Sequence, residues 1–81
     1  MAVTVRFFAA ARSAAGTAQT EVEPGTLASL LAGLVALMPG LQEVLPRCSF
    51  LVNGIAVHGD PAEVTVDSGA ELDVLPPFAG G

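Results

Sequence analysis

A single segment with helical periodicity stands between segments of strict alternation, and this order restricts the possible folds. In "LASLLAGLVALM", residues 27–38, apolar residues recur at spacings of three and four, Thr26 precedes them as a helix N-cap, and Pro39-Gly40 ends the pattern. The spacing predicts an amphipathic helix whose buried face comprises Leu27, Leu30, Leu31, Leu34, Leu37 and Met38. At about a dozen residues it is too short to cross a bilayer, which takes about 20.

Alternating segments on both sides of this helix predict strands. The expected strands are "VTVRFF" at 3–8, "AQTEV" at 18–22, "CSFLV" at 48–52, "IAV" at 55–57, a short extended piece near "VTV" at 64–66, and "ELDVL" at 71–75. The connection 9–17 is long enough to hold a short helical turn. Asn53-Gly54 predicts a tight hairpin, because a type I′ turn needs positive φ at both central residues.

One helix and a mixed sheet of four to five strands make an α+β domain in which the helix covers one face of the sheet. Strands at opposite ends of the chain, before and after the helix, are well placed to lie side by side and parallel in the sheet centre. This is the β-grasp arrangement. The sequence therefore predicts a β-grasp domain over 1–75 and an extended C-terminal tail over 76–81.

The charge composition argues against polyanionic partners. Eight acidic residues stand against three arginines, lysine is absent, and the formal net charge is −5. Binding to nucleic acid or to an anionic membrane surface would have no electrostatic source. The N-terminal segment alternates like a strand rather than like an export signal, so we expect a cytoplasmic protein with neither nucleic acid nor membrane as partner.

Cys48 and His58 are the only residues of their kinds. The chain therefore offers no disulfide within itself and no Cys/His cluster for a metal, and we predict no metal site. We interpret Cys48 as a small core residue on a strand and His58 as a solvated loop residue.

Alternation along the strands leaves large apolar side chains on the face away from the helix. If Val3, Val5 and Phe7 point toward the helix, Phe8 points away, and the same reasoning turns Leu51 and Leu75 outward. The proposed topology makes their strands neighbours. A contiguous apolar patch usually marks an interface, and we predict a partner surface here.

The chain ends on "PPFAGG". Pro76 and Pro77 lack N–H donors and fix φ, which ends strand pairing and projects the tail outward. Gly80 and Gly81 have no Cβ, so they fit a channel too narrow for other residues and present the terminal carboxylate there.

These stretches carry a resemblance to a known family. "FFAAAR" followed by "AAG", the "VNG" hairpin, the "DSGAELDVLPP" approach and the closing "GG" resemble the MoaD/ThiS family of ubiquitin-like sulfur carriers, and within it the small subunits of molybdopterin synthase. The resemblance runs nearly end to end.

The resemblance implies a function for the terminus. A ubiquitin-activating-type adenylyltransferase (MoeB-like) would use ATP to form a glycyl adenylate at Gly81, and a sulfurtransferase would convert it to a thiocarboxylate, 1-thioglycine. The tail would then enter the large catalytic subunit of molybdopterin synthase (MoaE-like) and give up its sulfur to the molybdopterin dithiolene. The chain would bind no cofactor itself and would not be catalytic alone.

The resemblance also assigns contact residues. The tail residues Pro76, Pro77, Phe78, Ala79 and Gly80 would bind the partner, with Phe78 as either a partner contact or a variable spacer. Phe8 and Arg12 match positions that contact the activating enzyme. Leu75 stands where relatives often carry an aromatic residue.

Other functions remain open at this stage. The same thiocarboxylate would serve thiamine, cysteine or tRNA thiolation, and a chain ending in Gly-Gly would also suit a ubiquitin-like protein modifier or an interaction module with an inert tail. Because the sequence has no lysine, only the N-terminal amine could accept a second copy of the protein in a poly-modifier chain.

Overall fold

A computed structural model describes residues 1–77. Along the chain the strands are β1 (Val3–Phe7), β2 (Gln19–Val22), β3 (Gly25–Thr26), β4 (Ser49–Val52), β5 (Ile55–Ala56), β6 (Thr65–Val66) and β7 (Glu71–Leu75). The α-helices are α1 (Ala9–Ala15) and α2 (Leu27–Leu37), and the short 3₁₀ helices are η1 (Pro39–Gln42), η2 (Leu45–Arg47) and η3 (Pro61–Glu63).

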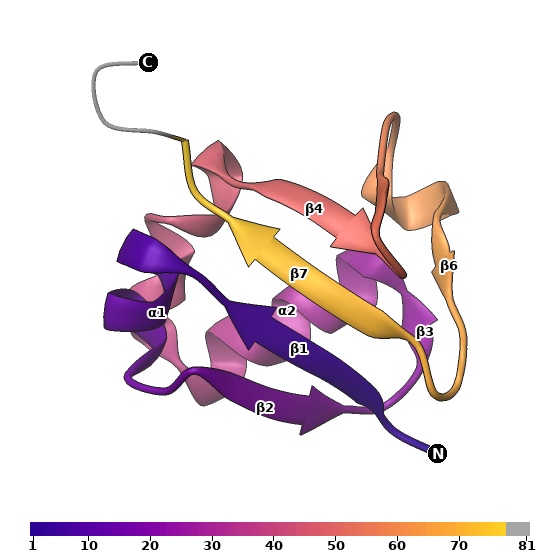
Figure 1. The fold of residues 1–81 in the computed structure, drawn as a ribbon, viewed down its shortest axis with the longest axis horizontal. Helices are drawn as coiled ribbons and strands as arrows, with labels where there is room; N and C mark the ends of the chain where they lie inside the picture. Colours follow the sequence, from indigo (N-terminus) through magenta and orange to yellow (C-terminus); the bar gives the residue numbers. More distant parts are fainter. Residues whose placement is uncertain (78–81) are drawn as a thin grey trace.

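The main sheet has five strands in the order β2-β1-β7-β4-β5 (Figure 1). β1 and β7 pair in parallel at its centre, and the other pairs are antiparallel. This confirms the predicted β-grasp arrangement, in which the first and last strands lie side by side. β6 lies within the extended piece predicted at 64–66, and it pairs with β3, a strand that was not predicted, in a separate two-stranded sheet.

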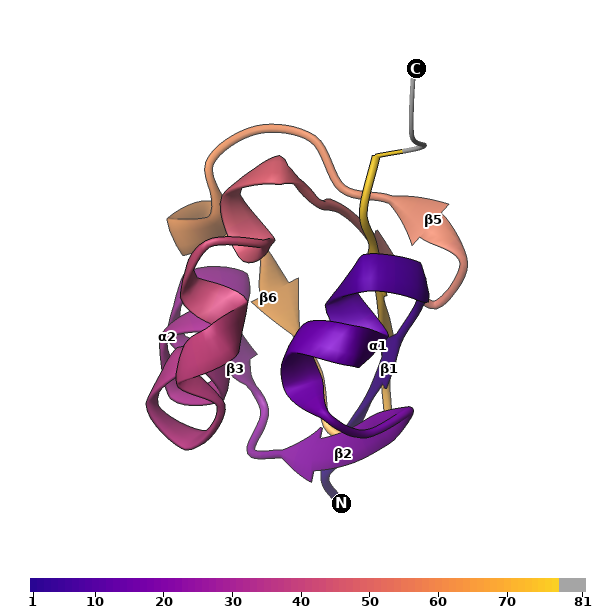
Figure 2. The same cartoon turned by 90° about the vertical axis from the view of Figure 1, so that its left-hand side faces the viewer.

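Helix α2 begins as predicted and covers one face of the sheet. The hydroxyl of Thr26 accepts a hydrogen bond from the backbone N–H of Ser29 at 3.1 Å, which satisfies one of the free donors of the first turn. Figure 2 shows the sheet nearly edge-on with α2 on one side of it. In the part of the chain described here, no helix is long and apolar enough to cross a membrane.

The buried face of α2 differs from the prediction at its C-terminal end. Leu27, Leu30 and Leu34 are buried, but Leu37 is 68% exposed. Leu37 is the last residue of the helix, and the chain then turns into η1 and η2, which bring Leu41 and Leu45 into the core. Because these residues complete the core, Leu37 is left in solvent.

The core lies between α2 and the inner face of the sheet. Phe50 and Val52 pack against it from β4 as the alternation predicts, and so does Cys48. Cys48 precedes β4 and ends η2, however, so its predicted place on a strand is wrong. The fully buried side chains include Val3, Val5, Leu27, Leu34, Leu41, Val66, Leu72 and Val74.

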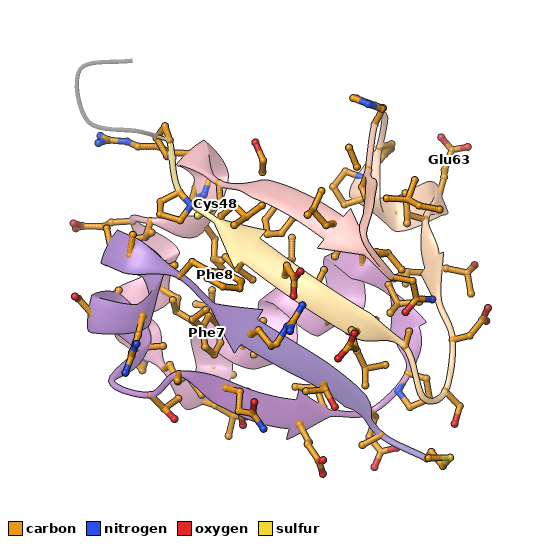
Figure 3. The ribbon with its side chains drawn as sticks, in the orientation of Figure 1. Phe7, Phe8, Cys48 and Glu63 are labelled. Atoms are coloured by element: carbon orange, nitrogen blue, oxygen red, sulfur yellow. The ribbon has the colours of Figure 1, made fainter. Side chains whose placement is uncertain are left out.

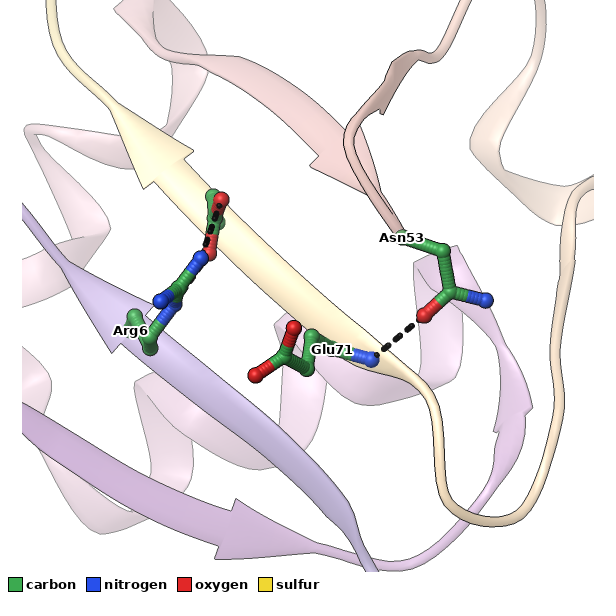
Figure 4. Close-up of polar contacts among 4 residues, drawn as sticks. Arg6, Asn53 and Glu71 are labelled. Carbon is green, nitrogen blue, oxygen red and sulfur yellow. Dashed lines mark hydrogen bonds and ion pairs between the residues drawn. The ribbon is translucent and has the colours of Figure 1, made fainter.

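The β4–β5 hairpin has the predicted turn, with φ of 51° at Asn53 and 82° at Gly54. Asn53 also ties the hairpin to β7. Its side-chain Oδ1 accepts a hydrogen bond from the Glu71 N–H at 2.9 Å, and its own N–H donates to the Glu71 carbonyl at 2.8 Å. Figure 4 shows the first of these contacts at the start of β7.

Candidate functional site

The face of the sheet opposite α2 carries no helix in the described structure, and Figure 1 looks onto it. The strand registers set side chains in rows across this face. One row runs from Arg6 through Asp73 to Leu51, and the next row toward the end of β7 pairs Leu75 with Ser49. The third row, at the opposite end, pairs Thr4 with Glu71.

The three predicted patch residues gather on this face, although Phe8 follows β1 and is not part of it as the sequence predicted. Phe7 pairs with Val74, so Phe8 and Leu75 each lie one residue beyond this pair, and the Phe8 N–H donates to the Val74 carbonyl at 3.2 Å. Phe8 is 39% exposed. Leu75 and Leu51 are partly exposed, and Leu51 lies diagonally across from Leu75 on β4. Figure 3 shows Phe8 at the end of the sheet where β1 and β7 finish.

Arg12 joins this end of the face from helix α1. β1 ends at Phe7, Phe8 is the N-cap of α1, and Arg12 lies one turn into the helix with its N–H 3.4 Å from the Phe8 carbonyl. The side chain of Arg12 is exposed. Arg12, Phe8, Arg6 and Gln19 line a shallow hollow of about 250 Å³, so the structure brings together two residues that the sequence assigned to one interface.

The tail leaves from the same end. β7 ends at Leu75, Pro76 is partly exposed and Pro77 is exposed. Both prolines line a hollow of about 260 Å³ together with Ala10, Glu43, Val44 and Arg47. The remaining predicted tail residues, Phe78, Ala79, Gly80 and Gly81, lie outside the described residues.

This face also carries an ion pair that the sequence alone did not predict. The guanidinium of Arg6 donates from Nε to Asp73 Oδ1 at 2.7 Å and from Nη2 to Oδ2 at 2.9 Å (Figure 4). Asp73 is buried although it faces away from the core. Alternation alone predicts that both side chains face outward, because Arg6 stands two residues before Phe8 and Asp73 two residues before Leu75. Only the parallel register of β1 and β7 sets Arg6 opposite Asp73.

The electrostatics of the site follow from this pair. The hydrogen bond from Arg6 to Asp73, followed by the charge of Asp73, raises the pKa of the Arg6 guanidinium, so the side chain stays cationic.

Cys48 lies outside this site. Burial raises the pKa of its thiol, whose Sγ lies 3.2 Å from the Val44 carbonyl oxygen. A thiol in this state is a poor nucleophile at neutral pH.

Residues 1–77 contain no group of three or more His, Cys, Asp or Glu side chains placed to hold a metal ion. The features of this end of the molecule are an apolar face, two arginines beside it and a strand that leads into the tail. Such an arrangement suits docking to a protein.

Known proteins resemble this chain in both sequence and fold. A "Molybdopterin synthase sulfur carrier subunit" of Chlamydomonas reinhardtii is 34% identical over 84 residues, covering all of both proteins. SAMP1 from Haloferax volcanii superposes with a TM-score of 0.84 at 25% identity, covering all of both chains. A chain in a complex of subunits 1 and 2 of molybdopterin-converting factor from Helicobacter pylori gives a TM-score of 0.73 at 25% identity, also over all of both chains.

These likenesses confirm the ubiquitin-like β-grasp fold. The model of the ThiS family matches residues 5–81, which is nearly the whole chain. The chain therefore belongs to the ThiS family.

Proposed function

We propose that this chain is a sulfur carrier, and that it serves as the small subunit of molybdopterin synthase. The observation that supports this most directly is the likeness to a sulfur carrier subunit of that enzyme, which covers the whole of both proteins. The outer face adds a physical argument, because β7 carries the chain past Phe8 and Leu75 directly into Pro76 and the tail.

The proposed chemistry takes place at the Gly81 carboxylate, which is a poor electrophile. An adenylyltransferase of the ubiquitin-activating type transfers AMP from ATP to this carboxylate and releases pyrophosphate. A sulfurtransferase persulfide attacks the acyl carbon and AMP leaves. A thiol then cleaves the sulfur–sulfur bond, which leaves a thiocarboxylate on Gly81.

The proposed partners divide the work. The apolar face and Arg12 dock on each partner in turn, while the tail carries the terminus into that partner's active site. The structure of subunits 1 and 2 from Helicobacter pylori supports a large subunit as the second partner. Gly80 and Gly81 suit a narrow channel because they lack Cβ atoms.

Mass spectrometry of the intact protein tests the site of thiolation. After incubation with the activating enzyme, ATP and a persulfide donor, the mass is expected to rise by the difference between one sulfur and one oxygen. A variant lacking Gly81 should show no such rise. Thiolation of the shortened protein would refute Gly81 as the site.

A pair of matched variants tests the docking face. Phe8→Asp places a charge on the apolar face, and Ile55→Asp places the same charge on an apolar residue that is 72% exposed on the edge strand β5. We expect Phe8→Asp to slow adenylation at least tenfold, as expected for loss of a buried apolar contact, while Ile55→Asp leaves it unchanged. Equal adenylation rates for Phe8→Asp and the unmodified protein would show that this face does not bind the activating enzyme.

SAMP1 is a small archaeal modifier protein, and the likeness to it supports a second candidate, a ubiquitin-like protein modifier joined through Gly81 to lysines of other proteins. A C-terminal remnant of this tail on lysines of digested cellular proteins would establish it. Recovery of unmodified proteins only, together with thiolated Gly81, would favour the sulfur carrier alone.

A further inference from the structure

The Arg6–Asp73 ion pair lies on the outer face beside the apolar residues Phe8, Leu51 and Leu75. Arg6 and Asp73 occupy paired positions on the two central strands, and Leu51 stands opposite Asp73 on β4. The side chain of Arg6 is 42% exposed, whereas that of Asp73 is only 10% exposed. The pair therefore combines a buried carboxylate with a guanidinium that still reaches the surface.

Stability alone does not explain such a pair. An ion pair with one partly exposed member contributes little net stability, and burying its carboxylate carries a desolvation cost. Replacing an ion pair that includes a buried charge by apolar residues is often neutral or stabilising, so the presence of these two charges requires a different reason.

The geometry leaves Arg6 with donors for another molecule. A guanidinium has five N–H groups, and Asp73 takes one from Nε and one from Nη2. No other hydrogen bond from this side chain forms within residues 1–77. The two-point contact holds the group in one orientation, and the Phe8 ring lies 5.9 Å from Arg6 Cζ. The free N–H groups are therefore preorganised beside the apolar patch.

The surrounding charges indicate which acceptor fits. Asp73 already neutralises Arg6, and the carboxylate of Glu71, on the next row of the same face, adds further negative charge near the guanidinium. A second carboxylate brought by a partner would meet two like charges. A neutral carbonyl oxygen, from a peptide bond or from Asn or Gln, meets only the free donors.

We propose that Arg6, held in place by Asp73, is a specificity-determining contact that requires a docking protein to present a neutral carbonyl oxygen among apolar side chains facing Phe8, Leu51 and Leu75. This proposal rests on the proposed function, because the docking protein is the large subunit. A partner with only apolar groups at this point strips water from the Arg6 donors without replacing it and is rejected.

The test compares affinities for the large subunit of the same organism, using the full chain. In Arg6→Met/Asp73→Leu, both charges are replaced by apolar groups, and we expect an unchanged or higher Tm with binding about tenfold or more weaker, as for loss of a hydrogen bond to a charged group. In Arg6→Asp/Asp73→Arg the pair is kept with the donors on the other strand, and binding should weaken similarly. Glu63→Gln, which neutralises an exposed acid in η3 outside this face, is the control and should bind within about twofold, as expected for an exposed charge.

The outcomes separate the two levels of the proposal. If the unmodified chain does not bind the large subunit, the proposed function fails, and the inference fails with it. If it binds and Arg6→Met/Asp73→Leu binds equally tightly, only the inference fails. Should that variant not fold, Arg6→Lys keeps the charge but loses the fork of donors; weakened binding would support the contact, and unchanged binding would overturn it.

Discussion

Gly33 and Gly40 differ in what a methyl group at each would meet. Gly33 lies exposed in the interior of α2, and a Cβ built there has no atom within 4 Å. Gly40 lies in η1, and a Cβ there would stand 2.8 Å from the backbone carbonyl oxygen of Ala14 in α1. The second glycine is thus needed for the close approach of α1 and η1, and the first is not.

Replacing each of these glycines by alanine is therefore expected to change stability in opposite directions. Gly33→Ala should raise the free energy of unfolding by about 1 kcal/mol, the difference between glycine and alanine inside a helix. Gly40→Ala should lower it by about 1–3 kcal/mol, because backbone must move to admit the methyl group. Urea denaturation measures both. A neutral or stabilising Gly40→Ala would show that α1 and η1 do not pack as described.

At the scale of the element, α2 depends on its first turn. The helix has no acidic residue in that turn, so the Thr26 hydroxyl is the capping group that the structure provides. Thr26 also belongs to β3, where it pairs with Thr65, and the Leu27 N–H donates to the Val64 carbonyl at 2.8 Å. The cap thus joins the helix to the small sheet.

Loss of this cap should be measurable by itself. Thr26→Ala is expected to lower the free energy of unfolding by about 1 kcal/mol, the usual cost of removing a Thr cap. Thr26→Ser removes only the methyl group and keeps the oxygen that accepts from Ser29, so it should cost less. Thermal unfolding of both variants decides the point, and equal losses would assign the effect to packing of the methyl group instead.

The parallel pairing of β1 and β7 also acts at the element scale. It brings the end of β1, with Phe8 and the start of α1, to the same edge of the sheet as the end of β7. An antiparallel pairing of these strands would send the tail away from Phe8 and Arg12. The direction of these strands therefore places the proposed docking face and the start of the tail, at Pro76, at the same end of the sheet.

At the scale of the whole molecule, one small core holds the domain together. A chain of 81 residues buries a modest area, and domains in general have only about 5–15 kcal/mol of net stability. The core joins α2 to both central strands through residues such as Leu34, Val5 and Leu72. The central strands β1 and β7, which carry much of the proposed docking face, are thus held in position by this core.

Two leucines of α2 make a matched test of this dependence. Leu34→Ala should lower the free energy of unfolding by about 2–5 kcal/mol, because Leu34 is fully buried and its loss leaves a cavity. Leu37→Ala should change it by no more than about 0.5 kcal/mol, because Leu37 projects into solvent. Chemical denaturation of the two proteins checks both values. A large loss for Leu37→Ala would contradict the position of the helix end.

The sequence by itself determined what depends on neighbours along the chain. The strand and helix periods, the Thr26 cap, the Asn53-Gly54 turn and the last strand were all predicted and are present. These features arise from backbone geometry and hydrogen bonds within a few residues. The outward position of Leu51 and Leu75 followed as well, because alternation fixes the face of a strand, whereas Phe8 lies just beyond the end of β1.

Only the tertiary structure decided what depends on distant partners. In the sequence, Asp73 is an acidic residue on the outward face of a strand. The register of β1 and β7 places it opposite Arg6, 67 residues away along the chain. Leu37 fits the helical period, yet it is exposed because Leu41 and Leu45 fill the core beneath the helix end. Periodicity describes one element at a time, whereas burial and charge pairing require two, and their register is set by how the whole core packs.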